Sequence, residues 1–500
     1  MKFKIAVLSV ILGFFYNLTL FCQNTFDIRI ATNNDEAFYG MIENHNNNYV
    51  FVGERRDKFD YSYQHAYITE IDPLGNIIRE SIINKLDTFV FLTTLIQKDN
   101  DNYLAFGMIK AIEDTIKYFY ICELDLNFDI SKERIYSIPP GKTIFSLYSL
   151  ENKLKNVILY GSFYTSYPFT LSYFLFETAQ NGDSIKMVVQ PDSKSNFSPI
   201  YSMIEKPGSG YFAMSHAFQN VNNYIRQIMS FDKDLNLISN RFLTEYVYNS
   251  GSLKWYSPDT YILSGKTHVL KGKSQDDQIV CMIIDTLHEN LKYYKELGKP
   301  DTTDIPGLHS SMDFTERNTI FIAGIDNFDY GDSPYLPVND NFIFLTVTDS
   351  MLNIKKEYFY GGDAGYILWD MKATSDNGCI LTATRYDENT QIDERDIVIL
   401  KVDSLGNLST EMDEPPIKVH MLILYPNPGS DRLTVQTAIQ CLGGTFTIFD
   451  SNGKEVLNIV IREQLTNLLT ESLPSGQYVY RYILKDKVIE TGKWIKILNP

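Results

Sequence analysis

The sequence predicts an all-β protein, a seven-bladed β-propeller followed by a small immunoglobulin-like β-sandwich. A unit of two strand hairpins recurs along the chain at a step of about 53 residues. The recurrence ends near residue 408, and short strands with different turns occupy the rest of the chain. Four strands per repeat are the content of a propeller blade, whereas a few unrelated short strands are typical of a sandwich.

The first hairpin of the repeat is an apolar strand, an Asp, a short turn closed by Asn or Asp, and a second strand. "AYITEIDPLGNIIRESI" is a clear copy and "YFLFETAQNGDSIKMVV" a degenerate one. The residues in register are Asp72, Asp125, Thr178, Asp232, Asp285, Asp349 and Asp403. Asp and Asn side chains bond to nearby backbone, so we interpret this element as a hairpin turn rather than a ligand site.

The other hairpin of the repeat comes before the Asp-containing hairpin in the chain. It consists of a polar turn followed by a strand, as in "QKDNDNYLAFGM". The residues in register are Tyr49, Tyr103, Val157, Tyr211, Tyr261, Ile320 and Cys379. Two hairpins give each repeat four strands. Seven copies therefore predict a seven-bladed propeller over residues 24–408.

The ends of the repeated region predict how the ring closes. "FDIRI" (Phe26–Ile30) matches the last strand of a repeat without the three strands that should precede it. The final repeat, which ends at "LGNLST", lacks a full last strand. We therefore expect Phe26–Ile30 to complete the seventh blade, which would leave no long open edge.

Residues 1–22 predict a secretory signal peptide. A basic start, "MKFK", precedes an apolar run from Ile5 to Phe21. A membrane anchor is the alternative, because the run approaches spanning length. Asn17 and Thr19 interrupt the run and no basic cluster follows it, so we expect cleavage and no stable transmembrane segment afterwards.

Charge and cysteine spacing narrow the possible partners. The formal net charge of −17 repels phosphate backbones, so we expect no nucleic-acid partner. The cysteines show no Cys-x-x-Cys spacing of the kind used for metal or redox chemistry. Cys122, Cys281 and Cys379 lie in apolar runs, which favours buried free thiols over disulfides.

No motif for catalysis or cofactor binding is present. The sequence has no His-Glu-x-x-His, no Gly-x-Ser-x-Gly and no phosphate-binding glycine loop, so we assign no catalytic residue, cofactor or metal ligand. One alternative concerns calcium, because the sixth repeat has an insertion with several carboxylates. They are Asp326, Asp329, Asp332 and Asp340. Their spacing is not that of an EF-hand, and a solvated loop is the simpler interpretation.

An aromatic-rich stretch, Tyr160–Phe174, also has two interpretations. Its rings could stack on a sugar or peptide, or they could pack between blades. For the ring as a whole we expect a glycan- or protein-binding module rather than an enzyme. A secreted hydrolase or lyase acting on polysaccharide or peptide is the alternative, because propeller active sites are assembled from loops and need leave no linear motif.

A different architecture begins after an acidic, Pro-rich linker at residues 409–420, "STEMDEPPIKVH". Beyond it, Asn452-Gly453 between apolar strands indicates a two-residue hairpin. Over residues 421–498 the blocks "YPNP", "FTIFDSNGKEV", "LPSGQYVYRY" and "GKWIKI" follow in order. They resemble the type A C-terminal sorting domain of type IX secretion system cargo from Bacteroidetes.

The resemblance assigns residues and a destination. The matching positions are Tyr425, Pro426, Asn427 and Pro428 in the first motif, Gly476 and Tyr478 in the middle motif, and Lys493 and Lys496 in the basic final strand. Such domains are recognised by the outer-membrane translocon and usually removed by its sortase. The resemblance therefore implies passage through the periplasm to a secreted or cell-surface state.

Overall fold

The computed structural model describes most of the chain between Gln23 and Ile497. The described ranges are 23–32, 34–57, 64–113, 117–166, 169–190, 199–220, 223–243, 251–271, 274–286, 290–299, 302–329, 339–387, 395–408, 422–437, 442–450, 453–484 and 487–497. The predicted signal peptide (1–22) and linker (409–420) lie outside them. None of the described residues form a helix long and apolar enough to cross a membrane. The chain divides into two compact units, Met1–Thr410 and Glu411–Pro500.

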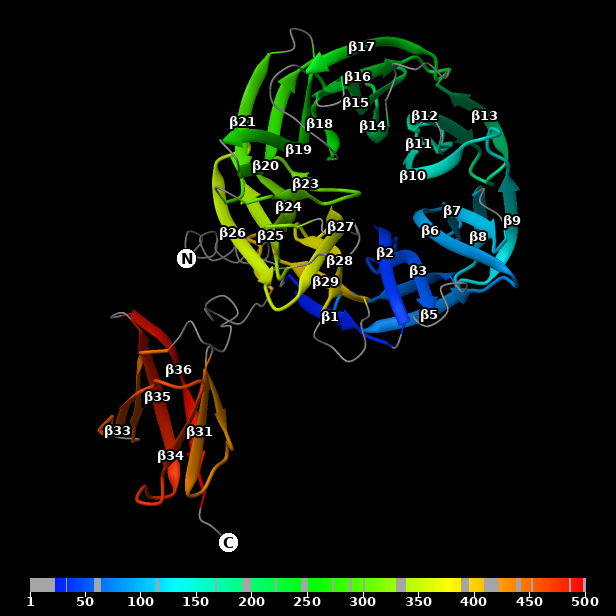
Figure 1. Cartoon of the computed structure of the whole chain (residues 1–500). Coiled ribbons are helices and arrows are strands. Elements are labelled where there is room, and N and C mark those ends of the chain that lie inside the picture. Colours follow the sequence, from blue (N-terminus) through cyan, green and yellow to red (C-terminus); the bar gives the residue numbers. More distant parts are fainter. Residues whose placement is uncertain are drawn as a thin grey trace, which may run out of the picture. The chain divides into compact units, whose positions relative to one another are not determined.

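The first unit is a ring of antiparallel sheets, so the predicted propeller class is confirmed (Figure 1). Its described residues form seven sheets, which we number as blades 1 to 7 along the chain. From inner to outer strand, blades 1 to 4 contain β2 (Asn34–Glu43), β3 (Tyr49–Asp57), β4 (Gln64–Ile71) and β5 (Ile77–Ile83); β6 (Thr88–Gln97), β7 (Tyr103–Ala111), β8 (Tyr118–Leu124) and β9 (Ile130–Tyr136); β10 (Thr143–Glu151), β11 (Val157–Ser166), β12 (Phe169–Thr178) and β13 (Ser184–Val189); β14 (Ile200–Glu205), β15 (Tyr211–Asn220), β16 (Asn223–Phe231) and β17 (Leu237–Leu243).

Blades 5 to 7 follow the same plan with two departures. Their strands are β18 (Leu253–Ser257), β19 (Thr260–Lys271), β20 (Ser274–Asp285) and β21 (Leu291–Leu297); β22 (Ile305–Pro306) with β23 (Met312–Glu316), β24 (Thr319–Asp326), β25 (Phe342–Thr348) and β26 (Ile354–Gly361); β27 (Gly365–Ala373), β28 (Cys379–Tyr386), β29 (Arg395–Val402) and β1 (Phe26–Ile30). Blade 6 has its inner strand split in two. Blade 7 takes its outer strand from the start of the ring.

Ring closure by β1 is confirmed. Phe26 pairs with Lys401, and the antiparallel register continues to Ile30 opposite Ile397. An ion pair between Arg29 and Asp396 joins the same two strands. Gln23 adds a contact just before β1, because its side chain accepts a hydrogen bond from the Ser404 amide (2.7 Å). The N-terminal strand is therefore held by both backbone and side chains.

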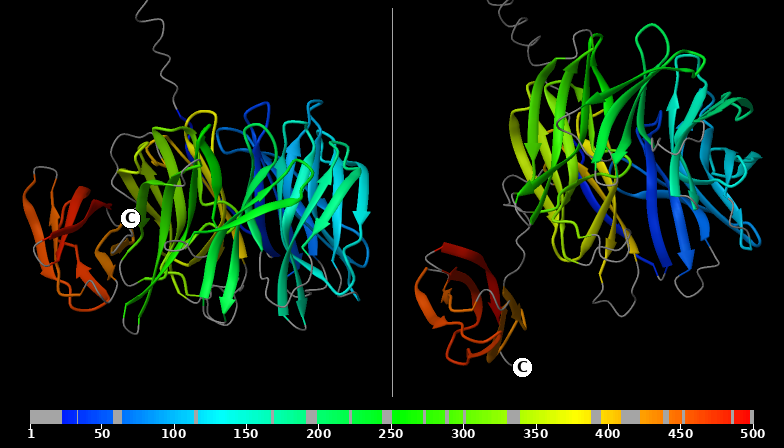
Figure 2. Two further views of the ribbon diagram at one scale, coloured as in Figure 1. Left: turned by 90° about the horizontal axis from the view of Figure 1, so that it is seen from above. Right: turned by 45° about the horizontal axis from the view of Figure 1, so that its top comes forward.

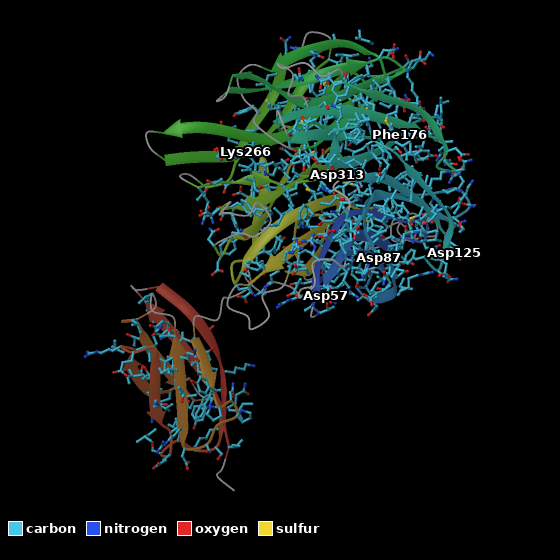
Figure 3. All side chains as sticks on the ribbon, turned by 45° about the vertical axis from the view of Figure 1, so that its right-hand side comes forward. Asp57, Asp87, Asp125, Phe176, Lys266 and Asp313 are labelled. Carbon is cyan, nitrogen blue, oxygen red and sulfur yellow. The ribbon has the colours of Figure 1, made fainter. Side chains whose placement is uncertain are left out.

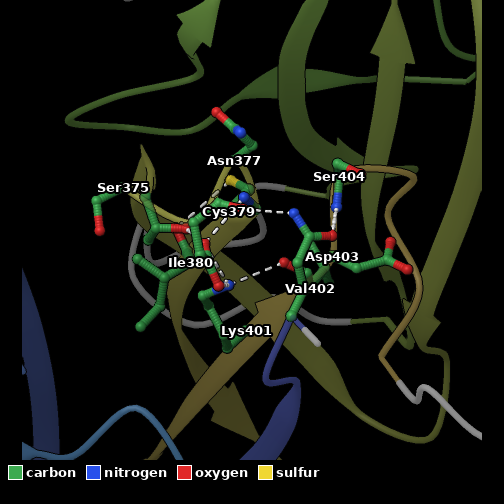
Figure 4. A network of polar contacts seen from close by, with 12 residues as sticks. Ser375, Asn377, Cys379, Ile380, Lys401, Val402, Asp403 and Ser404 are labelled. Atoms are coloured by element: carbon green, nitrogen blue, oxygen red, sulfur yellow. Dashed lines mark hydrogen bonds and ion pairs between the residues drawn. The ribbon is translucent and has the colours of Figure 1, made fainter. Parts of the chain in front are cut away.

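The turn between β27 and β28 in blade 7 is held by one buried lysine of β29 (Figure 4). The Lys401 ammonium donates to both oxygens of Asp376, at 2.9 and 3.1 Å, and to the Val402 carbonyl at 3.2 Å. Thr374 and the Gly378 amide also donate to Asp376. A buried charge is tolerated only when it is paired and hydrogen-bonded, and this network meets that requirement.

The repeated Asp residues do form turns, as predicted. Asp232 Oδ1 accepts the amides of Asp234 (2.9 Å) and Asn236 (2.8 Å), and Oδ2 accepts the Asn236 side-chain amide (2.9 Å). These hydrogen bonds, that from the Asn236 side chain first, lower the pKa of Asp232. The same three bonds recur at Asp72, Asp349 and Asp403. Each of these carboxylates is engaged by its own turn, which agrees with the hairpin interpretation.

Apolar side chains fill the space between neighbouring sheets (Figure 3). Blades 2 and 3, for example, share a cluster that includes Phe119, Phe163, Phe174 and Phe176. The rings of Phe163 and Phe174 stack at 4.5 Å, and both side chains are fully buried. Phe163 and Phe174 of the aromatic-rich stretch Tyr160–Phe174 therefore pack between blades, the second of the two interpretations given above.

The cysteine prediction is confirmed for the three described thiols. Cys122, Cys281 and Cys379 are free and buried. Burial raises the pKa of Cys122 to about 12, so this thiol stays protonated and unreactive. Cys22 and Cys441 lie outside the described residues.

The second unit is a pair of small sheets. One contains β30 (Leu422–Tyr425), β31 (Arg432–Thr437) and β34 (Leu465–Leu469), and the other contains β33 (Glu455–Val460), β32 (Thr445–Phe449), β35 (Gly476–Leu484) and β36 (Lys487–Lys496), in spatial order. Their facing side chains form one apolar core, whose largest fully buried members are Trp494 and Tyr482. The predicted C-terminal β domain is confirmed.

Candidate functional site

The predicted sorting residues come together along one edge of the second unit. β36 is the last strand of its sheet, so one of its edges has no strand neighbour within that sheet. Tyr425 ends β30, and the segment Pro426–Pro428 then runs beside this edge. Asn427 donates its side-chain N–H to the Lys493 carbonyl and accepts the Ile495 N–H through Oδ1, both at 3.0 Å. Its amide thus takes the place of a backbone peptide group.

Residues on both sides of Asn427 also bond to β36 or its neighbours. The Trp494 indole donates to the Pro426 carbonyl at 3.1 Å. The Gly429 amide donates to the Ile495 carbonyl (2.9 Å), and the Gly429 carbonyl accepts from the Ile497 amide (2.8 Å). Proline has no N–H to leave unpaired, which suits a segment that pairs through one side chain and one glycine. The Pro-Asn-Pro motif therefore covers a sheet edge that would otherwise be open.

The other sorting residues divide into buried and exposed ones. Tyr478 is buried, stacks near Trp494 (ring centroids 5.7 Å apart) and donates its hydroxyl to the Pro474 carbonyl at 2.6 Å. Gly476 pairs with Lys496 across β35 and β36. Lys496 is buried and donates to the Ser430 carbonyl at 2.5 Å, whereas Lys493 is exposed. Of the two lysines, only Lys493 presents its charge to solvent.

In the ring, the two faces differ in regularity. The strands run between these faces (Figure 2). One face carries the repeated Asp turns and short polar hairpins, and we call it the turn face. The other carries the connections between second and third strands and between blades, and we call it the loop face. Loops of varied sequence on a rigid scaffold are the usual place for binding residues.

Bulges direct large side chains toward the axis of the ring. The pairing of inner and second strands skips one residue on the inner strand in six blades. The skipped residues are Tyr39, Thr93, Phe145, Tyr201, Tyr256 and Trp369. A bulge leaves one residue unpaired and turns its side chain away from the regular alternation. The inner strands thus present aromatic rings that ordinary alternation would not place there.

Blade 6 replaces the bulge with a longer excursion. β22 and β23 both pair with β24, and Gly307 and Ser311 still bond to Ala323 of β24, so the residues that leave the sheet are Leu308–Ser310. Their amides reach blade 7 instead: Leu308 N donates to Leu368 O (3.0 Å) and His309 N to Trp369 O (2.7 Å). The excursion carries the imidazole of His309 to the centre of the ring.

His309 contacts three blades. Its ring lies 5.8 Å from Tyr39 in blade 1, 5.2 Å from Tyr148 in blade 3 and 5.8 Å from Trp369 in blade 7. Tyr39 and Trp369 also touch each other edge to face at 4.8 Å. We call His309, Tyr39, Tyr148 and Trp369 the axial cluster. Trp369 is buried, and the other three are partly exposed.

The protonation state of His309 follows from its contacts. Its Nδ1–H donates to the Tyr39 carbonyl at 2.5 Å, and no described residue donates to Nε2. Burial lowers the pKa of His309 to about 4. The imidazole is therefore neutral at physiological pH, with Nε2 as a hydrogen-bond acceptor.

Two carboxylates on inner strands have structural partners. Asp313 of blade 6 (labelled in Figure 3) accepts the Ala373 amide of blade 7 at 3.0 Å and pairs with Lys254 of blade 5. Asp370 accepts the amides of Met371 (2.9 Å) and of Met41 in blade 1. Burial raises the pKa of Asp370 to about 7. Each of these two carboxylates connects its inner strand to the next one.

A second polar group closes the seam between blades 7 and 1. Arg395 at the start of β29 lies 3.4 Å from Asp35 and 3.6 Å from Glu54, and Arg56 lies 3.2 Å from Glu54. The hydroxyl of Tyr39 also hydrogen-bonds Glu54. All four charged groups belong to the loop-face ends of their strands, so this cluster adjoins the axial cluster.

The structure describes only the two ends of the acidic insertion of the sixth repeat, up to residue 329 and from residue 339. Asp326 is buried and pairs with Lys299 at 2.5 Å, and Asp332 lies outside the described residues. Among the residues that the structure describes, no group of three His, Cys, Asp or Glu could hold a metal ion. Calcium binding here stays untested.

Sequence reasoning missed the axial cluster. The long step of the sixth repeat was assigned to the acidic insertion, but extra residues also lie at Gly307–Ser311, before β23. Aligning inner strands as well as Asp turns would have revealed "GLHSS" as an interruption. Tyr39 and Trp369 give no such indication, because a one-residue bulge leaves no trace in the repeat length.

Comparisons with known proteins identify the second unit. Residues 423–496 match the family described as Secretion system C-terminal sorting domain. This confirms the resemblance found in the sequence: the chain is type IX secretion cargo, exported to the cell surface or secreted. No curated protein matches the chain.

Solved structures match the chain at low similarity. The polysaccharide lyase Uly1 has a TM-score of 0.46 and 10% identity over 77% of this chain and 99% of its own. The β-propeller domain of the Trilobed protease from Pyrococcus furiosus has a TM-score of 0.42 and 10% identity over 76% and 99%. PorZ, a surface component of the type IX secretion system of Porphyromonas gingivalis, has a TM-score of 0.21 and 9% identity over 96% of this chain and 87% of its own. Scores this low support no inference about activity.

Removing the side chain of Asn427 should open the edge of β36. In N427A the Ile495 amide loses its acceptor, so its hydrogen exchange should accelerate, with a cost to the stability of the second unit of about 1 kcal/mol. K493A is the matched control, because it keeps the backbone carbonyl that Asn427 contacts and removes only an exposed side chain. Unchanged exchange at Ile495 in N427A would show that the Asn amide does not cover the edge.

The neutral state of His309 predicts a pH-dependent stability. The pKa in the folded protein, about 4, is below the ordinary value of 6.5, so between these values the unfolded chain binds a proton that the folded one does not. The contribution is fully present above pH 6.5 and declines toward pH 4, by at most about 1.4 kcal/mol per pH unit. Guanidinium denaturation at pH 7.5 and 5.0 should therefore show a larger loss for wild type than for H309Q.

The matched control for this measurement is H45Q, which removes an exposed imidazole on the turn face. It should not reproduce the difference seen with H309Q. If wild type and H309Q lose the same stability between the two pH values, the imidazole of His309 is not held neutral by burial.

Proposed function

We propose that the exported ring is a glycan-binding module and that the axial cluster is its binding site. The observation that carries this proposal is the convergence of His309, Tyr39, Tyr148 and Trp369 from four blades on one point. Binding sites are commonly lined by aromatic rings with a small number of placed polar groups. The axial cluster has this composition, and the partly exposed rings of Tyr39 and Tyr148 supply the surface.

The chemistry of the cluster suits a sugar. The apolar C–H face of a pyranose packs on an aromatic ring, and its hydroxyl groups need hydrogen-bond partners at the rim. Nε2 of neutral His309 is an acceptor for one such hydroxyl. A peptide ligand would be expected to use free backbone groups or exposed strand edges, but inner-strand amides at Ala373 and Leu253 are already bonded to neighbouring blades.

A secreted hydrolase or lyase at the same site is the second candidate. It is supported by Asp370, whose pKa burial raises to about 7, a value suited to proton transfer near neutral pH. The role of Asp370 as acceptor for the amides of Met41 and Met371 supports a structural function instead. Binding without turnover therefore remains the first proposal.

The sorting domain implies interaction with the secretion machinery, and we propose in addition that the associated sortase removes it near residues 409–420. An acidic, Pro-rich segment between two compact units would expose the backbone to a protease. Intact-mass measurement of protein released by the native host should then give a chain that ends before residue 421. A released chain extending to Pro500 would contradict removal.

Truncating one ring of the axial cluster should weaken glycan binding. Y148A removes a partly exposed ring that contacts His309, and it should lower affinity for a bound polysaccharide about tenfold, or about 1.4 kcal/mol. Y293A is the matched control, because Tyr293 is 38% exposed on an outer strand. Affinity electrophoresis and calorimetry measure the effect after screening a glycan array.

Three results would contradict the proposal. Equal affinity in wild type and Y148A would place binding elsewhere. Binding to peptide libraries but to no glycan would make the ring a protein-binding module. Release of oligosaccharides or unsaturated products would make it an enzyme.

A further inference from the structure

Two lysines at the loop-face side of blade 2 lie on aromatic rings. The Lys110 ammonium is 4.6 Å from the centre of the Phe89 ring, and that of Lys117 is 5.5 Å from the Phe91 ring. Phe89 and Lys110 are directly opposite each other on β6 and β7. The register that pairs Ile109 with Tyr118 brings the two lysines opposite one another. Both side chains are partly exposed.

Neither lysine forms a close ion pair with a described carboxylate, although Glu54 attracts Lys117 from a greater distance. Two carboxylates of the adjoining blade 1, Asp35 and Glu54, are already paired with the guanidinium groups of Arg395 and Arg56. Burial lowers the pKa of Lys117; the Glu54 carboxylate opposes this shift, and the like charges of Lys110 and Arg56 add to it. Unpaired, partly desolvated cations are costly, and an anion would relieve that cost.

The basic pair is continuous with the axial cluster. Phe91, under Lys117, touches Tyr39 edge to face at 6.3 Å, and Tyr39 touches Trp369 at 4.8 Å. A saccharide packed on Tyr39 would thus have its next residue close to Phe91 and the lysines. Aromatic faces with cations beside them suit a sugar ring that carries an acidic substituent.

We propose that the ligand is an anionic saccharide and that Lys110 and Lys117 bind its carboxylate or sulfate group. This inference rests on the proposed glycan-binding function and names the substrate class for that site. The acidic surface of the whole chain does not prevent it, because exposed charges are screened beyond about 8 Å at physiological ionic strength. One acidic group beside the lysines feels mainly the local positive charge, whereas a continuous polyphosphate backbone would meet the acidic surface as well.

The test compares matched probes and matched variants. Polygalacturonate and its methyl ester differ in the carboxylate charge, and dextran sulfate and dextran differ in the sulfate. K110Q/K117Q removes the basic pair, and K132Q/K356Q is a control that removes two exposed lysines from the outer strands β9 and β26. Thermal unfolding verifies that both variants fold, and calorimetry at 50 and 300 mM NaCl measures affinity.

The expected result is binding to one or both charged probes, weakened by salt, and at least tenfold weaker in K110Q/K117Q but not in the control. If K110Q/K117Q loses affinity for polygalacturonate alone, the ligand group is a carboxylate. If it loses affinity for dextran sulfate alone, the ligand group is a sulfate. Equal affinity for charged and uncharged probes, or unchanged affinity in K110Q/K117Q, overturns the anionic assignment and leaves glycan binding intact. Absence of binding to all four probes and to the glycan array overturns both proposals.

Discussion

The ring depends on how its inner strands satisfy their free edge. Each inner strand pairs with a second strand on one side only, so backbone amides on the other side face the axis and need acceptors. Side chains of neighbouring blades supply them: Ser202 accepts from Leu253 (3.0 Å), Ser252 from Ser311 (2.8 Å), and Asp313 from Ala373 (3.0 Å). These bonds connect sheets that otherwise meet only through apolar side chains, and they fix where each inner strand lies.

This constraint explains why some residues of the inner strands bond to the next blade while others keep their side chains free. Asp313 and Asp370 lie where a catalytic pair might be sought, yet each accepts an amide from the next blade. Residues outside the regular strand pairing, at the bulges and at Leu308–Ser310, are the ones whose side chains could meet a ligand. The turn face has little such freedom, because its Asp carboxylates are bound by their own turns.

The sequence was sufficient for the architecture because the features that define it are local and repeated. Asp232 and Asn236 form the same turn wherever the pattern occurs, and the matching blocks around Asn427 carried the sorting assignment. The axial cluster could not be predicted. Tyr39 and His309 are far apart in sequence, and their contact depends on a bulge in one blade and an excursion in another. Lys110 and Lys117 could not be singled out from the sequence either, because the role proposed for them depends on which side chains of blades 1 and 2 lie beside them.

The pairing of Phe26 with Lys401 also sets an order of assembly. Pairing between strands so distant in sequence is entropically costly and slow, so β1 is made first and has to wait for β29 before the ring can close. The sorting domain follows β29 in the chain. Every strand of the ring has therefore been synthesised before the sorting domain. The ring can therefore close before the sorting domain is complete. A ring that fails to close would leave β29 with an open edge that is prone to pair with other chains.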